Sequence, residues 1–502
     1  MNDRPARPSP VAQALASDRL GASAVVFFVI SAATPLTVVA GVVTTGYATT
    51  GLIGIPVAFV FVALVLALFS VGYVAMARHV ANAGAFYGFV SRGLGKPFGV
   101  GASWIALLSY NLLQVGLYGA AGAAAAPLVA EWFGVELAWW VFALAFWLVV
   151  AVLGLQHVDI NGKVLAVLLL AEVAVIMVYS VSNLAHPAGG EVTFDTLAPA
   201  ELIGPGAGAI LALAVLGFTG FESSVVFSEE VRNPRRTVAV ATYVSLAAIG
   251  GLYAFASWAM SVATGPDNIV GESQAQSSEL LFSLAGSQLG PGLATAGRVL
   301  FVTSILAAMI SFHNTIARYM FALGRERVLP AVLGRTSPRT GSPVAGSSIQ
   351  SGIGLVVIGL FALAEWDPLV HLFYWGGTSG GLGILVLIVA TSFAVISFFA
   401  RQPSGENLWQ RMIAPALASV AVLVVLVLVL ANFGTLLGTP PESPLPWLVP
   451  TIYGLAGLAG VLWALVLRIR RPLVYAAIGL GAKSPASLTG STSGEEYRGT
   501  RL

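Results

Sequence analysis

Long uninterrupted runs of apolar residues alternate with short polar or charged loops along the whole chain. A helix that crosses a lipid bilayer needs about 20 mostly apolar residues. Because the runs are continuous, they do not fit the alternating strands of roughly ten residues that build a membrane barrel. Twelve runs therefore predict transmembrane helices near residues 21–47, 52–77, 98–126, 137–155, 162–183, 207–229, 237–264, 292–322, 344–364, 369–398, 411–436 and 446–468.

Composition supports a polytopic, all-α membrane protein. Hydrophobic residues make up 57% of the 502 positions and charged residues only 9%, whereas a soluble chain carries about 25% charged residues. The net charge of +2 is too small to indicate a nucleic-acid partner. The chain has no cysteine, which excludes disulfides and thiolate metal sites. The expected partner is the lipid bilayer.

The positions of the charges predict the topology. If the N-terminus is cytoplasmic, every one of the 24 basic residues except Arg298 falls in an inner segment, as the positive-inside rule requires. Acidic residues instead occupy the outer loops, as do Glu131, Glu279 and Asp367. We therefore expect a multi-pass protein of the cell (cytoplasmic) membrane, with both termini in the cytoplasm.

Two of the predicted helices contain residues that interrupt a helix. The first includes VISAATPLTVVAG at 29–41, in which Pro35 removes a backbone N–H. The sixth includes LGFTGFESS at 216–224, with Gly217, Gly220 and the acidic Glu222. Interrupted helices at matching positions of two halves point to the substrate site of a transporter. A proline kink, or glycines for close helix packing, is the alternative interpretation.

Three longer motifs carry a family resemblance. They are GFTGFESSVVFSEEVRNPRRTVAVA at 217–241, RYMFALGRERVLPAVLGRTSPRTGSPVAG at 318–346 and ANAGAFYGFVSRGLGKPFG at 81–99. With these three motifs the chain resembles the amino acid–polyamine–organocation superfamily of secondary transporters. The resemblance implies a LeuT-like fold with broken helices 1 and 6. Its parts would be a cytoplasmic tail 1–20, inverted five-helix repeats 21–183 and 207–398, two further helices in 411–468, and a tail 469–502.

The resemblance also implies a binding site between the two broken helices. A substrate carboxylate would bind the unwound part of helix 1, and its ammonium group would face the carbonyls of helix 6. The site residues implied in this way are Ser31, Ala32, Ala33, Thr34, Asn111, Gly217, Phe218, Thr219, Gly220 and Phe221. Leu216 replaces an aromatic gate of some relatives, so the gate candidates are Phe218, Phe221, Phe373, Tyr374 and Trp375.

Two acids lie within predicted helices and are candidates for proton coupling. Glu172 lies in mid-helix 5 and Glu222 follows the break of helix 6. An ionised carboxylate is costly at that depth, so such residues are functional candidates by default. A structural hydrogen bond between helices is the alternative for each.

A charge cluster follows helix 6. Glu229, Glu230 and Arg232 are candidates for a cytoplasmic gate, in which an ion pair would form with a basic residue of another inner segment, Arg78, Arg92 or Arg318. An exposed and solvated cluster is the alternative.

These features predict a secondary active transporter of amino acids that works by alternating access and proton symport. Exchange of amino acids or amines without proton coupling is the alternative, and a multi-pass enzyme fits poorly because the five histidines show no metal-ligand spacing. We expect a small-molecule substrate (an amino acid or amine), a proton, no cofactor, no metal and no catalytic residue. Glu222 is the one acid near the predicted site, which favours neutral amino acids; the oligomeric state is not predicted.

Overall fold

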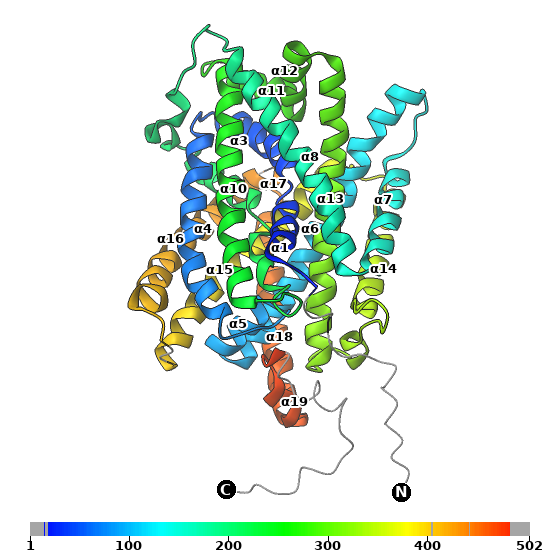
Figure 1. Ribbon diagram of the computed structural model, residues 1–502, viewed down its shortest axis with the longest axis vertical. Coiled ribbons are helices and arrows are strands. Elements are labelled where there is room, and N and C mark those ends of the chain that lie inside the picture. The colour runs from blue at the N-terminus through cyan, green and yellow to red at the C-terminus, as the bar shows by residue number, and fades with distance from the viewer. Residues whose placement is uncertain (1–14, 16–18, 403–404, 441, 482–502) are drawn as a thin grey trace, which may run out of the picture.

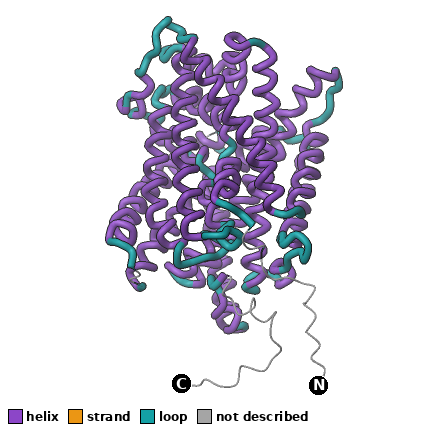
Figure 2. The backbone as a smooth tube through the Cα atoms, in the orientation of Figure 1, coloured by secondary structure: helices purple, strands orange, loops and turns teal. Residues whose placement is uncertain are grey.

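The structure is a computed structural model that describes residue 15 and residues 19–402, 405–440 and 442–481. It is a bundle of long helices (Figures 1 and 2). These residues form no strand, and an isolated bridge joins Leu20 to Val231. Most of the predicted tail 1–20, and residues 482–502 of the predicted C-terminal tail, lie outside the described residues.

The helices follow the apolar runs closely. Eleven helical segments of the described chain are long and apolar enough to cross a membrane. Predicted helix 1 is built from α1 (Ala22–Ala32), α2 (Pro35–Thr37), π-helical η1 (Val38–Val42) and α3 (Val43–Thr50). Predicted helix 6 is built from α9 (Ala207–Gly217) and the 3-10 turn η4 (Phe221–Val225). The others are α4 (Ile55–Ala77), α6 (Lys96–Phe133), α8 (Val158–Ala185), α10 (Pro234–Thr264), α13 (Pro291–Arg325), α14 (Val344–Leu363), η7 with α15 (Pro368–Tyr374, Trp375–Arg401), η8 with α16 (Trp409–Ile413, Ala414–Ala431) and α18 (Leu445–Arg470).

Two predicted helices differ in length from the structure. The fourth is α7 (Trp139–Gly154), whose 16 residues are fewer than the usual 20. The third was expected to end at 126, before Pro127, but α6 continues through that proline to Phe133. Proline is tolerated inside membrane helices because neighbouring groups satisfy the freed backbone.

Short helices mark the two ends of the bundle (Figure 1). We call the end with α11 (Ile269–Gln276) and α12 (Leu280–Leu289) the acidic end, because Glu131 at the end of α6 and Glu279 beside α12 lie there. The opposite end, with α5 (Phe86–Gly93) and α19 (Pro472–Ala477), is the basic end. The helix α19 lies within the stretch that was predicted to be a tail.

Helix packing places the two broken helices at the centre. The helices α4 and α10 lie along each other, and α6 packs along both α15 and α18. Glycines of α15 allow that contact. A Cβ atom at Gly376 would lie 2.9 Å from the Leu112 carbonyl oxygen, and one at Gly380 would lie 2.6 Å from Leu113 Cγ. These two glycines of α15 therefore allow it to pack closely against α6.

Candidate functional site

The break in helix 1 lies where the sequence predicted it. The helix α1 ends at Ala32, and the Ala33 N–H turns back to the carbonyl of Ile30. Thr34 then adopts a left-handed conformation with φ of 46°, which is uncommon for a β-branched residue. Pro35 begins the second half of the helix, because a first helical residue needs no N–H of its own.

The break in helix 6 depends on a glycine. The helix α9 ends at Gly217, and Gly220 has φ of 111°, which favours glycine over any other residue. A Cβ atom at Gly220 would lie 2.5 Å from the Cβ of Ala32. The two breaks, far apart in the sequence, therefore touch each other.

A glutamate contacts the backbone at each break. Glu172 of α8 accepts hydrogen bonds through Oε1 from the Leu36 N–H (2.5 Å) and the Ser304 hydroxyl (2.6 Å). Glu222 accepts from the Gly220 N–H (2.9 Å) on Oε2 and from the Tyr110 hydroxyl (2.8 Å) on Oε1. Both side chains are buried.

The two carboxyl groups differ in how completely they are bonded. Both oxygens of Glu222 receive a donor, and its backbone carbonyl accepts from the Tyr73 hydroxyl (2.7 Å). The Oε2 atom of Glu172 has no hydrogen-bond partner among the described residues. Ser304, which donates to Glu172, itself accepts a hydrogen bond from the Thr37 hydroxyl (3.4 Å), and Thr37 lines a cavity.

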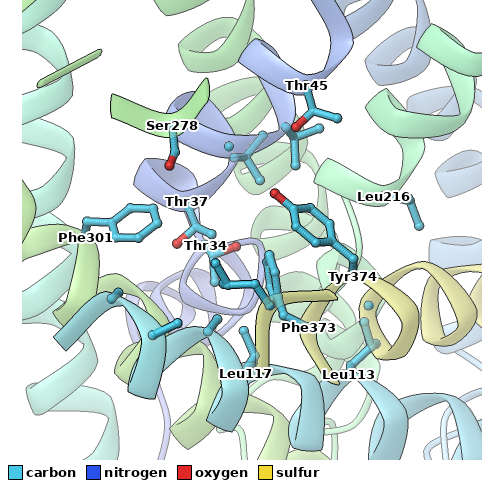
Figure 3. Close-up of a pocket in the computed structure, with 18 of the residues that line it drawn as sticks. Thr34, Thr37, Thr45, Leu113, Leu117, Leu216, Ser278, Phe301, Phe373 and Tyr374 are labelled. Atoms are coloured by element: carbon cyan, nitrogen blue, oxygen red, sulfur yellow. The ribbon is translucent and has the colours of Figure 1, made fainter. Parts of the chain in front are cut away.

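A cavity of about 560 Å³ extends from the two breaks towards the acidic end. Thr34 and Thr37 lie on its wall near the break, and Phe301 and Tyr374 approach from different helices (Figure 3). Most of the wall is apolar, from residues such as Leu113, Leu117, Leu216, Phe312 and Phe373. The charged residues of the wall are Glu131, Glu279 and Arg298.

The cavity contains only part of the predicted substrate site. Four predicted residues line it: Ala32, Ala33, Thr34 and Thr219. The other six do not belong to its lining: Ser31, Asn111, Gly217, Phe218, Gly220 and Phe221. The Asn111 amide donates to the Leu107 carbonyl of its own helix (2.7 Å). Phe218 packs beside Phe59 and Tyr253 instead.

Of the gate candidates, Phe373 and Tyr374 line the cavity, whereas Trp375 does not. Sequence reasoning missed Phe301 and Phe312 of α13. Their separation corresponds to about three helical turns, which puts both on one face of the helix. That spacing is the signal in the sequence that could have pointed to them.

Two buried ion pairs lie at the basic end, where residues that follow helix 6 meet α13. Glu230 forms a two-pronged pair with Arg318 (Nε–Oε2 2.5 Å, Nη2–Oε1 3.0 Å), and both side chains are only 1% exposed. Glu229 pairs with Arg325 (2.6 and 2.7 Å) and accepts from the Ala83 N–H. The Arg232 N–H donates to the Leu20 carbonyl.

The partners only partly match those expected for the charge cluster. Arg318 was among the three predicted partners, but Arg325 was not. Arg78 pairs with Glu406 at 3.3 Å instead, on the surface. We name the two buried pairs, Glu230–Arg318 and Glu229–Arg325, the inner latch. A solvated cluster does not describe them, because these four side chains are buried.

A further buried carboxyl group lies beside the inner latch. Glu326 accepts hydrogen bonds from the Tyr87 hydroxyl, from Asn82 (3.2 Å) and from the N–H groups of Gly479 (2.6 Å) and Gly481 (2.7 Å). Burial raises the pKa of Glu326, and the bonds from Tyr87, Gly479 and Gly481, together with the charge of Arg325, oppose that shift. The segment after α19 is thereby attached to the basic end.

The described residues contain no group of three or more His, Cys, Asp or Glu side chains that could hold a metal ion. The arrangement is thus a cavity beside two broken helices, with buried carboxyl groups at the breaks and the inner latch at the basic end. This geometry can bind a small molecule and admit it from one side.

Comparison with known proteins identifies the family. The family model described as amino acid permease matches residues 20–458. The low-affinity putrescine importer PlaP of Escherichia coli is 23% identical over 369 residues, which is 70% of this chain and 75% of that protein. The branched-chain amino acid permease BcaP of Bacillus subtilis is 26% identical over 44% of each chain.

A solved structure confirms the predicted fold. The manganese transporter of Eremococcus coleocola superposes with a TM-score of 0.56 at 14% identity, covering 90% of this chain and 94% of that one. The all-α, LeuT-like architecture is therefore correct. The similar proteins are permeases and transporters, so the chain moves solutes and is not an enzyme. The chain belongs to the amino acid permease family of the amino acid–polyamine–organocation superfamily.

Proposed function

We propose that this permease is a secondary active transporter of amino acids or amines that works by proton symport and alternating access. The observation that carries the proposal is the cavity that ends at two touching helix breaks. Irregular backbone at membrane depth is tolerated where it lines a cavity or is buried in protein. In transporters such breaks form the substrate site.

The orientation follows from the charges. The basic end is proposed to face the cytoplasm, together with both termini, in the cell membrane, because the basic loops gather there. The cavity then opens to the outside, while the inner latch separates it from the cytoplasm. Release of substrate inwards requires the Glu230–Arg318 and Glu229–Arg325 pairs to separate. Arg232 is proposed to support this gate through its contact with Leu20.

Glu172 is proposed to carry the coupling proton. The hydroxyls of Thr37 and Ser304 link it to the cavity, and its Oε2 atom is not engaged by another described group. A proton on Oε2 leaves Oε1 able to accept from Leu36 and Ser304. Protonation therefore changes the charge beside the break of helix 1 without removing these bonds.

Glu222 is proposed as a second group that responds to pH. Its two oxygens hold Gly220 and Tyr110, so a change in its charge acts directly on the break of helix 6. Because both oxygens already accept donors, a proton on Glu222 weakens one of these bonds, since a protonated oxygen is a poorer acceptor. Glu222 therefore couples protonation to the conformation of the break, whereas Glu172 couples it to the cavity.

The test is uptake of radiolabelled amino acids and amines into sodium-free proteoliposomes that hold the purified chain. We expect an inward proton gradient to drive accumulation in the wild type. Glu172→Gln should still bind and equilibrate substrate but should not accumulate it, because the amide cannot exchange a proton. Accumulation by Glu172→Gln with an unchanged pH profile would contradict proton coupling through Glu172. Uptake that requires preloaded substrate and ignores the gradient would indicate exchange instead.

A further inference from the structure

The last segment that the structure describes lies against the basic end of the bundle, where α19 is seen (Figure 1). We call residues 472–481, which comprise α19 and the four residues after it, the C-terminal strap. Leu473, at the start of α19, is 86% exposed. Ile478, Gly479 and Gly481 are instead buried. The strap therefore starts on the surface and inserts its tip into the protein.

The tip of the strap is bound by one buried side chain. The N–H groups of Gly479 and Gly481 donate to the two oxygens of Glu326, at 2.6 Å to Oε2 and 2.7 Å to Oε1. Glu326 itself is 1% exposed. A buried carboxyl oxygen that loses a donor is costly to leave unsatisfied. Two N–H groups that converge on one carboxyl group therefore fix the position of the tip.

The position of the tip requires glycine at both of these residues. Gly479 and Gly481 have φ of 78° and 60°, a region that side chains disfavour. A Cβ atom at Gly479 would lie 2.7 Å from the Cβ of Ser91, and one at Gly481 would lie 2.5 Å from the Ala81 carbonyl oxygen. A side chain at either position would therefore displace the tip.

The helical part of the strap makes a second contact. Lys96, the first residue of α6, donates through Nζ to the Ala476 carbonyl (2.8 Å). The same ammonium group lies over the ring of Tyr475, 5.2 Å from its centre. Lys96 is partly exposed, and surface contacts of a charged side chain are weak. The strap thus joins the start of α6 to the end of α13, and the contact with α13 is the buried one.

Glu326 also connects the tip to the inner latch. It directly follows Arg325, which pairs with Glu229. Glu326 accepts a further hydrogen bond from the Asn82 amide (3.2 Å), and the next residue, Ala83, donates its N–H to Glu229 (3.0 Å). Both groups that bind Glu229 are therefore neighbours in the sequence of Glu326 or of its partner.

We infer that the C-terminal strap is an autoinhibitory contact that keeps the inner latch formed. Docked on Glu326, it holds the loop after α4 against the end of α13. The two groups that bind Glu229 then stay in place. Withdrawal of the strap frees this loop, and the basic end opens more often. The inference rests on the proposed function, in which the inner latch separates before substrate is released inwards, and it adds a control of that step.

Two cysteine reporters test the inference, because the chain has no native cysteine. Ile478→Cys reports on release of the tip, and Ser228→Cys, next to Glu229 of the inner latch, reports on opening of the basic end. In the full chain, Gly481→Ala places a side chain against the Ala81 carbonyl. Thiol labelling of each reporter should be faster by about tenfold or more, because the left-handed conformation is costly for alanine.

Gly438→Ala is the matched control for this variant. Gly438 has nearly the same conformation as Gly481, with φ of 63° against 60°, but nothing lies within 4 Å of an added Cβ atom. It should leave labelling of both reporters unchanged. Lys96→Ala removes the second contact without touching the tip, and it should speed labelling of both reporters by about twofold.

Two results would overturn the inference. One is unchanged labelling of Ile478→Cys in Gly481→Ala, since the tip would then not depend on its contact at this glycine. The other is faster labelling of Ile478→Cys with unchanged labelling of Ser228→Cys, since the strap would then not control the inner latch. Lys96→Ala allows the same comparison if Gly481→Ala does not fold. Proton-driven uptake by the wild type is measured separately, so a failure of the transport proposal leaves the two labelling rates to decide on the strap.

Discussion

The acidic end and the basic end of the bundle each contain a glutamate–arginine ion pair, and the two pairs differ in burial. At the acidic end, Glu279 and Arg298 form an ion pair whose side chains are 55% and 31% exposed, on the wall of an open cavity. At the basic end, Glu230 and Arg318 form a pair in which each side chain is 1% exposed. Burial makes the difference, because water screens the first pair but not the second.

This contrast suggests a division of labour. The exposed pair neutralises Arg298 in the wall at little cost, whereas each buried pair of the inner latch holds two charges out of water. Removing one partner of a buried pair leaves a charge without compensation. The following predictions test this difference, from the largest expected effect to the smallest.

Arg318→Ala should have the largest effect. It leaves Glu230 buried and unpaired, at a cost of about 3–5 kcal/mol, and so favours opening of the basic end. Because the chain has no native cysteine, Ser228→Cys reports on this opening directly; Ser228 is 2% exposed beside the inner latch. Thiol labelling should be faster by more than about a hundredfold in the Arg318→Ala background.

Arg335→Ala is the control for this measurement, because Arg335 is an exposed arginine of the loop that follows α13. It should leave labelling of Ser228→Cys unchanged. If Arg318→Ala labelled at the wild-type rate, the buried pair would not hold the basic end closed.

An intermediate, pH-dependent effect is expected at Glu326. Burial raises the pKa of this carboxyl group, so the stabilisation that its bound proton provides is present at low pH and is lost as the pH rises through the raised pKa. Hydrogen exchange at Gly479 and Gly481 should therefore show more frequent opening at higher pH, relative to Glu326→Gln measured at the same pH. Equal pH profiles for the two proteins would contradict this role.

Arg298→Ala should have the smallest effect on stability. Its pair with Glu279 is exposed, and such pairs contribute about 0–1 kcal/mol. Thermal unfolding of the purified chain at low and high salt checks this, and salt should reduce the already small difference. A loss as large as that expected for Arg318→Ala would remove the contrast between the two ends.

The helices and their breaks could be predicted from the sequence because both have local causes. A run of apolar residues forms a membrane helix wherever it lies, and Pro35 and Gly220 interrupt helices through their own backbone chemistry. The length of α6 was the exception. The apolar run predicted an end near residue 126, yet the helix continues through Pro127 to Phe133.

The contacts of the candidate site were less predictable. Glu172 was identified because an acid in mid-helix is unusual, but its bond to Leu36 joins residues 136 positions apart. Arg325 as the partner of Glu229 had no local signal that distinguished it from the neighbouring arginines. Asn111 differs from these two, because its amide bonds to the Leu107 carbonyl four residues earlier in its own helix.

The sequence by itself determined which segments enter the membrane, which ends of them share a side and where two of them break. These properties depend on hydrophobicity, charge and backbone chemistry within a few residues. Only the tertiary structure decided that the N–H groups of Leu36 and Gly220 are bonded to the protein's own glutamates, and that both breaks lie beside one cavity. Such pairings depend on how distant helices pack, and no local pattern encodes them.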